Sequence, residues 1–133
     1  MFEDSFSILS YVRSFWTTSM AYSFCGRWDE AVEEGKHALN IAKKYSNDDL
    51  ISYAAGPICT AYTFKGDISQ AIEYGELSVK KAPTPFNKAM ADAALAYAQF
   101  HSGDLHKGIE TLDVYIQIGR AGHMQEQHMP LLC

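Results

Sequence analysis

Residues 61–72 read AYTFKGDISQAI, and two other stretches repeat the pattern: AYSFCGRWDEAV at 21–32 and AQFHSGDLHKGI at 98–109. The glycines in the middle of the three stretches are separated by 40 and then by 37 residues. Repetition with a period of about 20 to 50 residues is typical of arrays in which one small unit stacks on copies of itself. The sequence therefore predicts a solenoid, whose core is spread along a line of repeats.

The second repeat shows how each unit is expected to fold, as two helices joined by a tight turn. Gly66 supplies the left-handed backbone that ends the first helix. Asp67 is then placed to cap the second helix, and Gln70 three residues later completes a capping box. The second helix carries one apolar stripe at helical spacing, formed by Ile68, Ala71, Ile72, Gly75 and Val79. The fold class expected is all-α, an α-solenoid of about three helical hairpins plus the start of a further helix.

The chain is expected to form a single domain over residues 1–133. We place the repeats at about 10–46, 47–83 and 84–121, with a partial fourth repeat over 122–133. The last segment is apolar and lacks the polar outer face that terminal repeats need. This favours either a fragment of a longer protein or an end that a second copy covers.

Two features inside the helices predict close packing and bending. Gly35 and Gly75 stand at matching places in mid-helix, where glycine is about 1 kcal/mol less favourable than alanine. We therefore expect a side chain from a neighbouring helix to cross at each glycine. Pro57 falls inside the first helix of the second repeat, where it removes a hydrogen bond. We favour a kinked helix over a later helix start, because the apolar residues keep helical spacing across the proline.

Composition and charge argue against several function classes. The formal net charge is −5, whereas binding to a nucleic-acid backbone needs clustered lysine and arginine. No apolar run approaches the length of a membrane span, and the N-terminus has no basic region of the kind that opens a signal peptide. We expect a cytoplasmic protein that binds neither nucleic acid nor membrane.

The cysteines and histidines form no recognised chemical motif. The three cysteines contain no CxxC pair, and Cys25 and Cys59 are expected to be free, buried thiols. Four histidines form two pairs with a spacing of five residues: His101 with His106, and His123 with His128. Zinc-binding histidines on one helix are four residues apart. We therefore expect no metal, no cofactor and no enzymatic activity. A small metal-binding protein or enzyme that uses the histidines remains a minor alternative.

The three units resemble the tetratricopeptide repeat (TPR) family. That family places a small residue and then an aromatic residue on the first helix, glycine at the turn and alanine early in the second helix. The small residues here are Ser19, Cys59 and Ala96. The aromatic residues are Tyr22 and Tyr62, with Gln99 departing from the pattern. The early alanines are Ala31 and Ala71, with Gly108 in the third unit.

The resemblance covers about residues 12–121, and the repeats exceed the usual 34 residues of the family. In this respect the chain is similar to long-repeat TPR arrays of large bacterial regulatory proteins. The resemblance implies a protein-protein interaction or scaffold module that binds a protein or peptide partner, as part of a larger regulatory or signalling protein.

The resemblance also implies where a partner would bind. In TPR arrays the first helix of each pair lines the concave face, which here gives an aromatic and apolar groove with one cation. The groove residues expected are Arg13, Trp16, Met20, Phe24, Tyr53, Thr60, Phe64, Met90, Ala94, Tyr97 and His101. Two alternatives remain open at this point. The groove could be covered by the chain's own packing, or the module could self-assemble as a homodimer through its uncapped ends.

Overall fold

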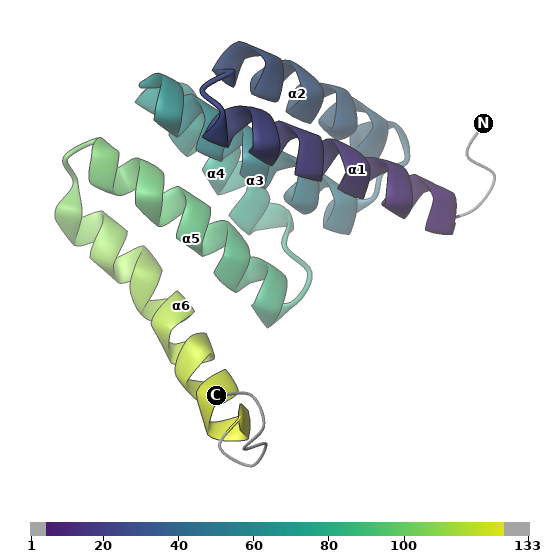
Figure 1. Cartoon of the computed structure of the whole chain (residues 1–133). Coiled ribbons are helices and arrows are strands. Elements are labelled where there is room, and N and C mark those ends of the chain that lie inside the picture. The colour runs from purple at the N-terminus through teal and green to yellow at the C-terminus, as the bar shows by residue number, and fades with distance from the viewer. Residues whose placement is uncertain (1–4, 127–133) are drawn as a thin grey trace.

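The computed structural model describes residues 5–126, and within this range the chain forms six helices and no strand. The helices are α1 (Ser5–Phe24), α2 (Trp28–Lys44), α3 (Asp48–Lys65), α4 (Ile68–Lys81), α5 (Pro85–His101) and α6 (Leu105–Glu126). They form three helical hairpins that stand in a row, with α1 and α6 at opposite ends (Figure 1). The predicted all-α array of three helical hairpins is confirmed.

Each hairpin turns at a glycine whose backbone is in the left-handed region. The φ angles are +79° at Gly26, +92° at Gly66 and +88° at Gly103. A Cβ atom added at any of the three would meet no atom within 4 Å, so the backbone conformation, and not a lack of space, requires glycine there. After the second turn Asp67 caps α4 by accepting a hydrogen bond from the Gln70 N–H at 3.4 Å. The three glycines occupy equivalent bends, as the repeat predicts.

Successive hairpins stack through a glycine notch on the second helix of each pair. A Cβ atom added at Gly35 on α2 would lie 2.5 Å from Cγ1 of Ile58 on α3. One added at Gly75 on α4 would lie 3.0 Å from Cδ1 of Leu95 on α5. Ile58 and Leu95 are 37 residues apart and hold matching places in their repeats. The expectation that a neighbouring side chain crosses at each glycine is confirmed.

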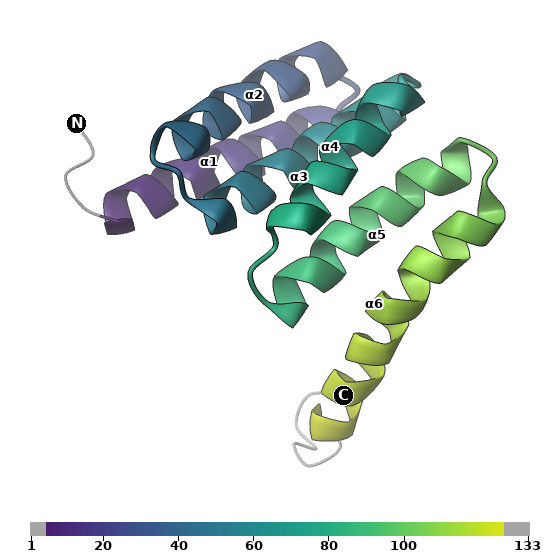
Figure 2. The same ribbon diagram turned by 180° about the vertical axis from the view of Figure 1, so that it is seen from behind.

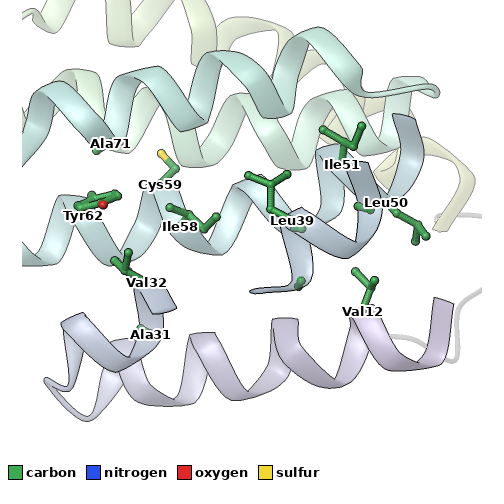
Figure 3. Close-up of a cluster of buried hydrophobic side chains, with 14 of the residues drawn as sticks. Val12, Ala31, Val32, Leu39, Leu50, Ile51, Ile58, Cys59, Tyr62 and Ala71 are labelled. Carbon is green, nitrogen blue, oxygen red and sulfur yellow. The ribbon is translucent and has the colours of Figure 1, made fainter. Parts of the chain in front are cut away.

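One cluster of buried apolar side chains runs through the first four helices and reaches Ala98 on α5. Figure 3 shows side chains of α1, α2, α3 and α4 meeting in this cluster, with Ile58 and Cys59 near its middle. Two serines add a polar link between α3 and α4. Ser52 donates its hydroxyl to the Ser78 carbonyl at 2.7 Å, and Ser78 donates its own to the Ser52 carbonyl at 2.8 Å.

The first helices of the hairpins form one continuous layer. α1 packs on α3 and α3 packs on α5, whereas α2 and α4 are joined mainly through α3. The view from behind shows the same row of hairpins, with α5 and α6 as the end pair (Figure 2). Residues separated by one repeat in the sequence therefore lie side by side on the first-helix layer.

Two helices continue past a residue of a kind that often ends a helix, a proline in α3 and a glycine in α6. α3 runs unbroken across Pro57, so the alternative of a later helix start is excluded. α6 runs unbroken to Glu126, so no new helix starts at residue 122. Gly122 does not end α6, because a glycine inside a helix costs only about 1 kcal/mol relative to alanine. The rest of the expected fourth repeat, residues 127–133, lies outside the described residues.

Candidate partner-binding groove

The first helices of the three hairpins present aligned stripes of side chains on one face, which we call the first-helix face. Each stripe follows the spacing i, i+4, i+7, i+11 and i+15, and none of its residues is fully buried. The stripes consist of Leu9, Arg13, Trp16, Met20 and Phe24 on α1; Asp49, Tyr53, Gly56, Thr60 and Phe64 on α3; and Phe86, Met90, Ala93, Tyr97 and His101 on α5. Matching places are 40 and then 37 residues apart, as are the turn glycines.

A hollow of about 410 Å³ lies at the middle of the first-helix face. It is lined by Trp16, Met20, Ser52, Tyr53, Gly56, Thr60, Ser78, Phe86, Asn87, Met90, Ala91, Ala93 and Ala94, and no lining residue is charged. The central row explains the hollow: α1 offers Trp16, whereas α3 and α5 offer only Gly56 and Ala93 at the matching places. The hollow is therefore the space of two missing side chains beside an indole ring.

Gly56 contributes to the hollow for a reason that also concerns the backbone. A Cβ atom added at Gly56 would have the Ser78 hydroxyl oxygen as its nearest neighbour at 3.8 Å, which is an ordinary contact. The next residue is Pro57, whose ring disfavours helical backbone in a preceding residue that carries a Cβ atom. Gly56 thus keeps α3 helical before the proline and at the same time leaves the hollow empty of a side chain.

An aromatic ledge, formed by Phe24, Phe64, Tyr97 and His101, borders the hollow where α1, α3 and α5 end. The ring centroids of Phe24 and Phe64 are 5.9 Å apart, those of Phe64 and Tyr97 are 5.9 Å apart, and those of Tyr97 and His101 are 4.4 Å apart. These separations are typical of interacting rings. Phe24 is 72% exposed. Aromatic surface therefore continues across all three first helices without a break.

The opposite border of the hollow is polar. A smaller hollow of about 290 Å³ shares Tyr53, Phe86 and Asn87 with the main one and also contacts Arg13 and Asp49. The Asn87 side-chain amide donates a hydrogen bond to Asp49 Oδ1 at 2.7 Å. Arg13 is exposed and forms no ion pair with another residue of the described range 5–126. This border thus places the guanidinium group of Arg13, which is unpaired within residues 5–126, beside the apolar hollow.

Two cations next to the aromatic ledge, Arg27 and Lys65, are paired with carboxylates. Lys65 follows Phe64 and donates a hydrogen bond to Asp29 Oδ1 at 2.6 Å, and this bond raises the pKa of Lys65 above its ordinary value. Arg27 donates its Nε–H to Glu30 Oε1 at 2.8 Å. Because each of these two cations has a carboxylate partner, neither offers a free positive charge to a ligand at the ledge.

The structure places every predicted groove residue on the first-helix layer. Trp16, Met20, Tyr53, Thr60, Met90 and Ala94 line the central hollow; Phe24, Phe64, Tyr97 and His101 form the aromatic ledge; and Arg13 stands at the polar border. The residues that the sequence analysis selected from three separate helices thus lie on one surface.

Other lining residues were missed by the sequence argument. Phe86 precedes Met90 by one helical turn and is 68% exposed, so the same stripe rule would have found it. Ser78 belongs to α4, a second helix, and reaches the hollow because Gly56 has no side chain above it. Only the tertiary packing places Ser78 there.

The described thiols differ in their surroundings. Cys59 is buried, with its Sγ 3.5 Å from the Ala94 carbonyl oxygen, and burial raises its thiol pKa to about 12. It therefore stays protonated at neutral pH and is a poor nucleophile. The prediction that both thiols are buried is wrong for Cys25, which is exposed because it lies in the turn after α1, outside the packed helix faces.

Among the described residues, no three histidine, cysteine, aspartate or glutamate side chains come close enough together to hold a metal ion. None of the described helices combines the length and the apolar character that crossing a bilayer requires.

Comparison with known proteins identifies the fold. No protein-family model matches the chain, and no curated protein matches it. The structure is similar to the crystal structure of the TPR domain of Arabidopsis FLU, with a TM-score of 0.72 and 20% sequence identity. The similarity covers 86% of this chain and 98% of the FLU domain. The chain therefore has a TPR-like fold, as its turn and packing residues indicate.

Proposed function

We propose that this chain is a protein-interaction module whose first-helix face binds a segment of a partner protein. The observation that carries the proposal is the uninterrupted apolar surface formed by the hollow and the aromatic ledge across α1, α3 and α5. Large apolar side chains there remain in contact with solvent, among them Phe24 at 72%, Phe86 at 68% and Met90 at 51% exposure. Contiguous exposed apolar surface marks interaction sites.

The form of the surface favours a helical segment as the ligand. It crosses three parallel stripes and has no free strand edge to extend, which suits the insertion of an amphipathic helix into a groove. Trp16 and Tyr53 pack against each other with ring centroids 5.6 Å apart, so the hollow has one rigid aromatic wall. Rigid aromatic side chains in well-packed hollows are the residues that contribute most to binding energy.

Removal of two aromatic side chains of the first-helix face, Trp16 and Phe64, is expected to cause most of the binding affinity to be lost. Helix-forming peptides of about 14 residues, roughly 21 Å long as helices, are selected from a displayed random library on the purified protein. We expect Trp16→Ala combined with Phe64→Ala to weaken their binding at least about tenfold, measured by isothermal titration calorimetry. Both side chains are partly exposed, so the variant is expected to stay folded by circular dichroism.

A control double variant removes two solvent-exposed aromatic side chains elsewhere. Trp28 begins α2 and Tyr45 follows its end, and neither lines the hollow nor belongs to the aromatic ledge. Trp28→Ala combined with Tyr45→Ala is expected to leave peptide affinity within about threefold of the original protein. Equal losses in the two double variants would reject the first-helix face as the binding surface.

Self-assembly is a second candidate function, because the outer face of α6 exposes large apolar side chains. Ile109 and Ile116 are 60% and 41% exposed, whereas Val32 and Leu39 hold the matching places on α2 and are 8% and 3% exposed. The side chains on α2 are covered by the next hairpin, and within the described residues those on α6 are not. A second copy that pairs through α6 about a two-fold axis would bury them.

The oligomeric state of the purified protein tests self-assembly through α6. If α6 pairs with α6 of a second copy, sedimentation equilibrium gives a dimer, and Ile109→Glu converts it to a monomer because burying an unpaired charge is costly. Ile109 is exposed in one chain, so the variant is expected to keep its helical content. A protein that is monomeric at high concentration without the substitution would exclude this candidate.

A further inference from the structure

The hollow on the first-helix face has features that restrict the chemistry of its occupant. Its floor contains Ser52 and Ser78, but each hydroxyl already donates to the carbonyl of the other residue. The hydroxyl of Thr60 donates to the Gly56 carbonyl at 3.3 Å. Hydroxyl groups satisfied in this way gain little from a polar ligand. No lining residue is charged, so an ion buried there would lose its hydration without finding a partner.

The size of the hollow sets how much apolar material it holds. An apolar cavity of about 150 Å³ is large enough for a benzene ring. The hollow of about 410 Å³ therefore has room for two large apolar side chains and not merely one. On a helix two such side chains lie on the same face when they are three or four residues apart, which is one turn or about 5.4 Å.

Two methionines stand at opposite walls of the hollow and make it adaptable. Met20 comes from α1 and Met90 from α5, and Met90 is 51% exposed. Methionine has three rotatable bonds and a polarizable sulfur, so it fits itself to ligands of different shape. The fixed elements are the Trp16 ring, which packs against the Tyr53 ring, and the two small residues Gly56 and Ala93.

From these features we infer that the hollow takes a pair of large, uncharged apolar side chains, one helical turn apart, from a helical segment of the partner protein. The inference rests on the proposed function and specifies the ligand of the same surface. Gly56 and Ala93 determine the specificity, because their small size leaves the space that the two anchors fill. The Trp16 ring forms the wall against which the anchors pack.

The test uses the peptides selected from the displayed helix-forming library. We expect the retained peptides to share two residues among leucine, isoleucine, methionine, phenylalanine and tryptophan, three or four positions apart. Alanine at either position is expected to weaken binding at least about tenfold, as for other anchor residues. Lysine or glutamate at either position is expected to abolish measurable binding.

A variant that fills the hollow tests the space directly. Ala93 lies in the middle of α5 and is only partly buried, so Ala93→Leu places its larger side chain in the hollow. Ala93→Leu is expected to weaken peptide binding at least about tenfold, whereas Ala93→Ser, which scarcely changes the volume, is expected to stay within about threefold. If circular dichroism shows that Ala93→Leu is unfolded, Thr60→Leu fills the hollow from α3 instead and is expected to give the same loss.

Each remaining outcome decides against the inference. If peptide binding is lost in the Trp16→Ala, Phe64→Ala variant but unchanged by filling the hollow, the first-helix face binds its ligand elsewhere along the ledge. The proposed function then stands and the anchor pair is wrong. If the selected peptides share no apolar pair, or if no peptide is retained, the inference is likewise overturned. Self-association that Ala93→Leu abolishes would assign the hollow to a second copy of the chain.

Discussion

Replacement of Ile58 by alanine is expected to lower the free energy of unfolding by roughly 2–5 kcal/mol. Ile58 is completely buried, and its Cγ1 occupies the notch that Gly35 leaves on α2. Removing the side chain opens a cavity between the first two hairpins that rigid helix backbones cannot close. The loss is measured by urea unfolding monitored by circular dichroism. The slope of the unfolding free energy against urea concentration is expected to stay unchanged. The same substitution at the half-buried Ile41 provides the matched control and should cost clearly less.

A double-mutant cycle tests whether Ile58 and Gly35 act as one contact. Gly35→Ala alone is expected to destabilise the protein by up to about 2 kcal/mol, because overpacking costs roughly 1–3 kcal/mol and alanine returns about 1 kcal/mol of helix propensity. The double variant with Ile58→Ala is expected to lose less than the two single losses together, since the new methyl group fills part of the cavity. Additive losses would mean that the glycine notch does not join the hairpins.

Gly66→Val is expected to destabilise the protein by roughly 2–3 kcal/mol through the backbone alone. Gly66 has φ near +92°, a conformation that a β-branched residue resists strongly, and a side chain there would meet no neighbouring atom. The loss would therefore come from the turn and not from a clash. Thermal or urea unfolding measures it, and an effect below about 0.5 kcal/mol would contradict the equivalence of the three bends.

Replacing Ser46 by glycine is the reverse change and serves as a control for Gly66→Val. It lies between α2 and α3 with φ of +50°, the one non-glycine residue with positive φ among the described residues. Ser46→Gly removes the cost of placing a Cβ atom in the left-handed region, and we expect a stability gain of about 0.5–1 kcal/mol. A loss at Ser46 together with a loss at Gly66 would show that these positions respond to side-chain contacts instead.

The fold could be predicted from the sequence because its determinants are local. Glycine with positive φ, an aspartate cap and a stripe of apolar residues each act within a few residues, and their repetition at 40 and 37 residues fixed the hairpins. Gly35 and Gly75 also allowed the packing to be predicted. A glycine in mid-helix destabilises its own helix, so its recurrence at matching places indicates a close contact with a neighbouring helix. The first-helix face was expected because of the resemblance to the TPR family, whose first helices line the concave face, and the repeat period only placed the residues on it.

The depth and contents of the groove could not be predicted in this way. Whether Gly56 serves the backbone before Pro57 or opens a hollow depends on which side chains of α1 and α5 stand beside it. Ser78 enters the lining from the other layer, and no pattern along α4 marks it. The exposure of Cys25 depended on where the packed face of α1 ends, which the apolar spacing alone does not define.

The most direct test of the account is a two-dimensional NMR titration of the protein with a selected peptide. Binding to the first-helix face predicts that the largest shift changes fall on the backbone amides of Gly56 and Ala93 and on the indole N–H of Trp16. The amides of α2 and of the outer face of α6, including Ile109, are expected to change little. Changes centred on α2 or on Ile109, with Trp16 and Gly56 unaffected, would contradict the account.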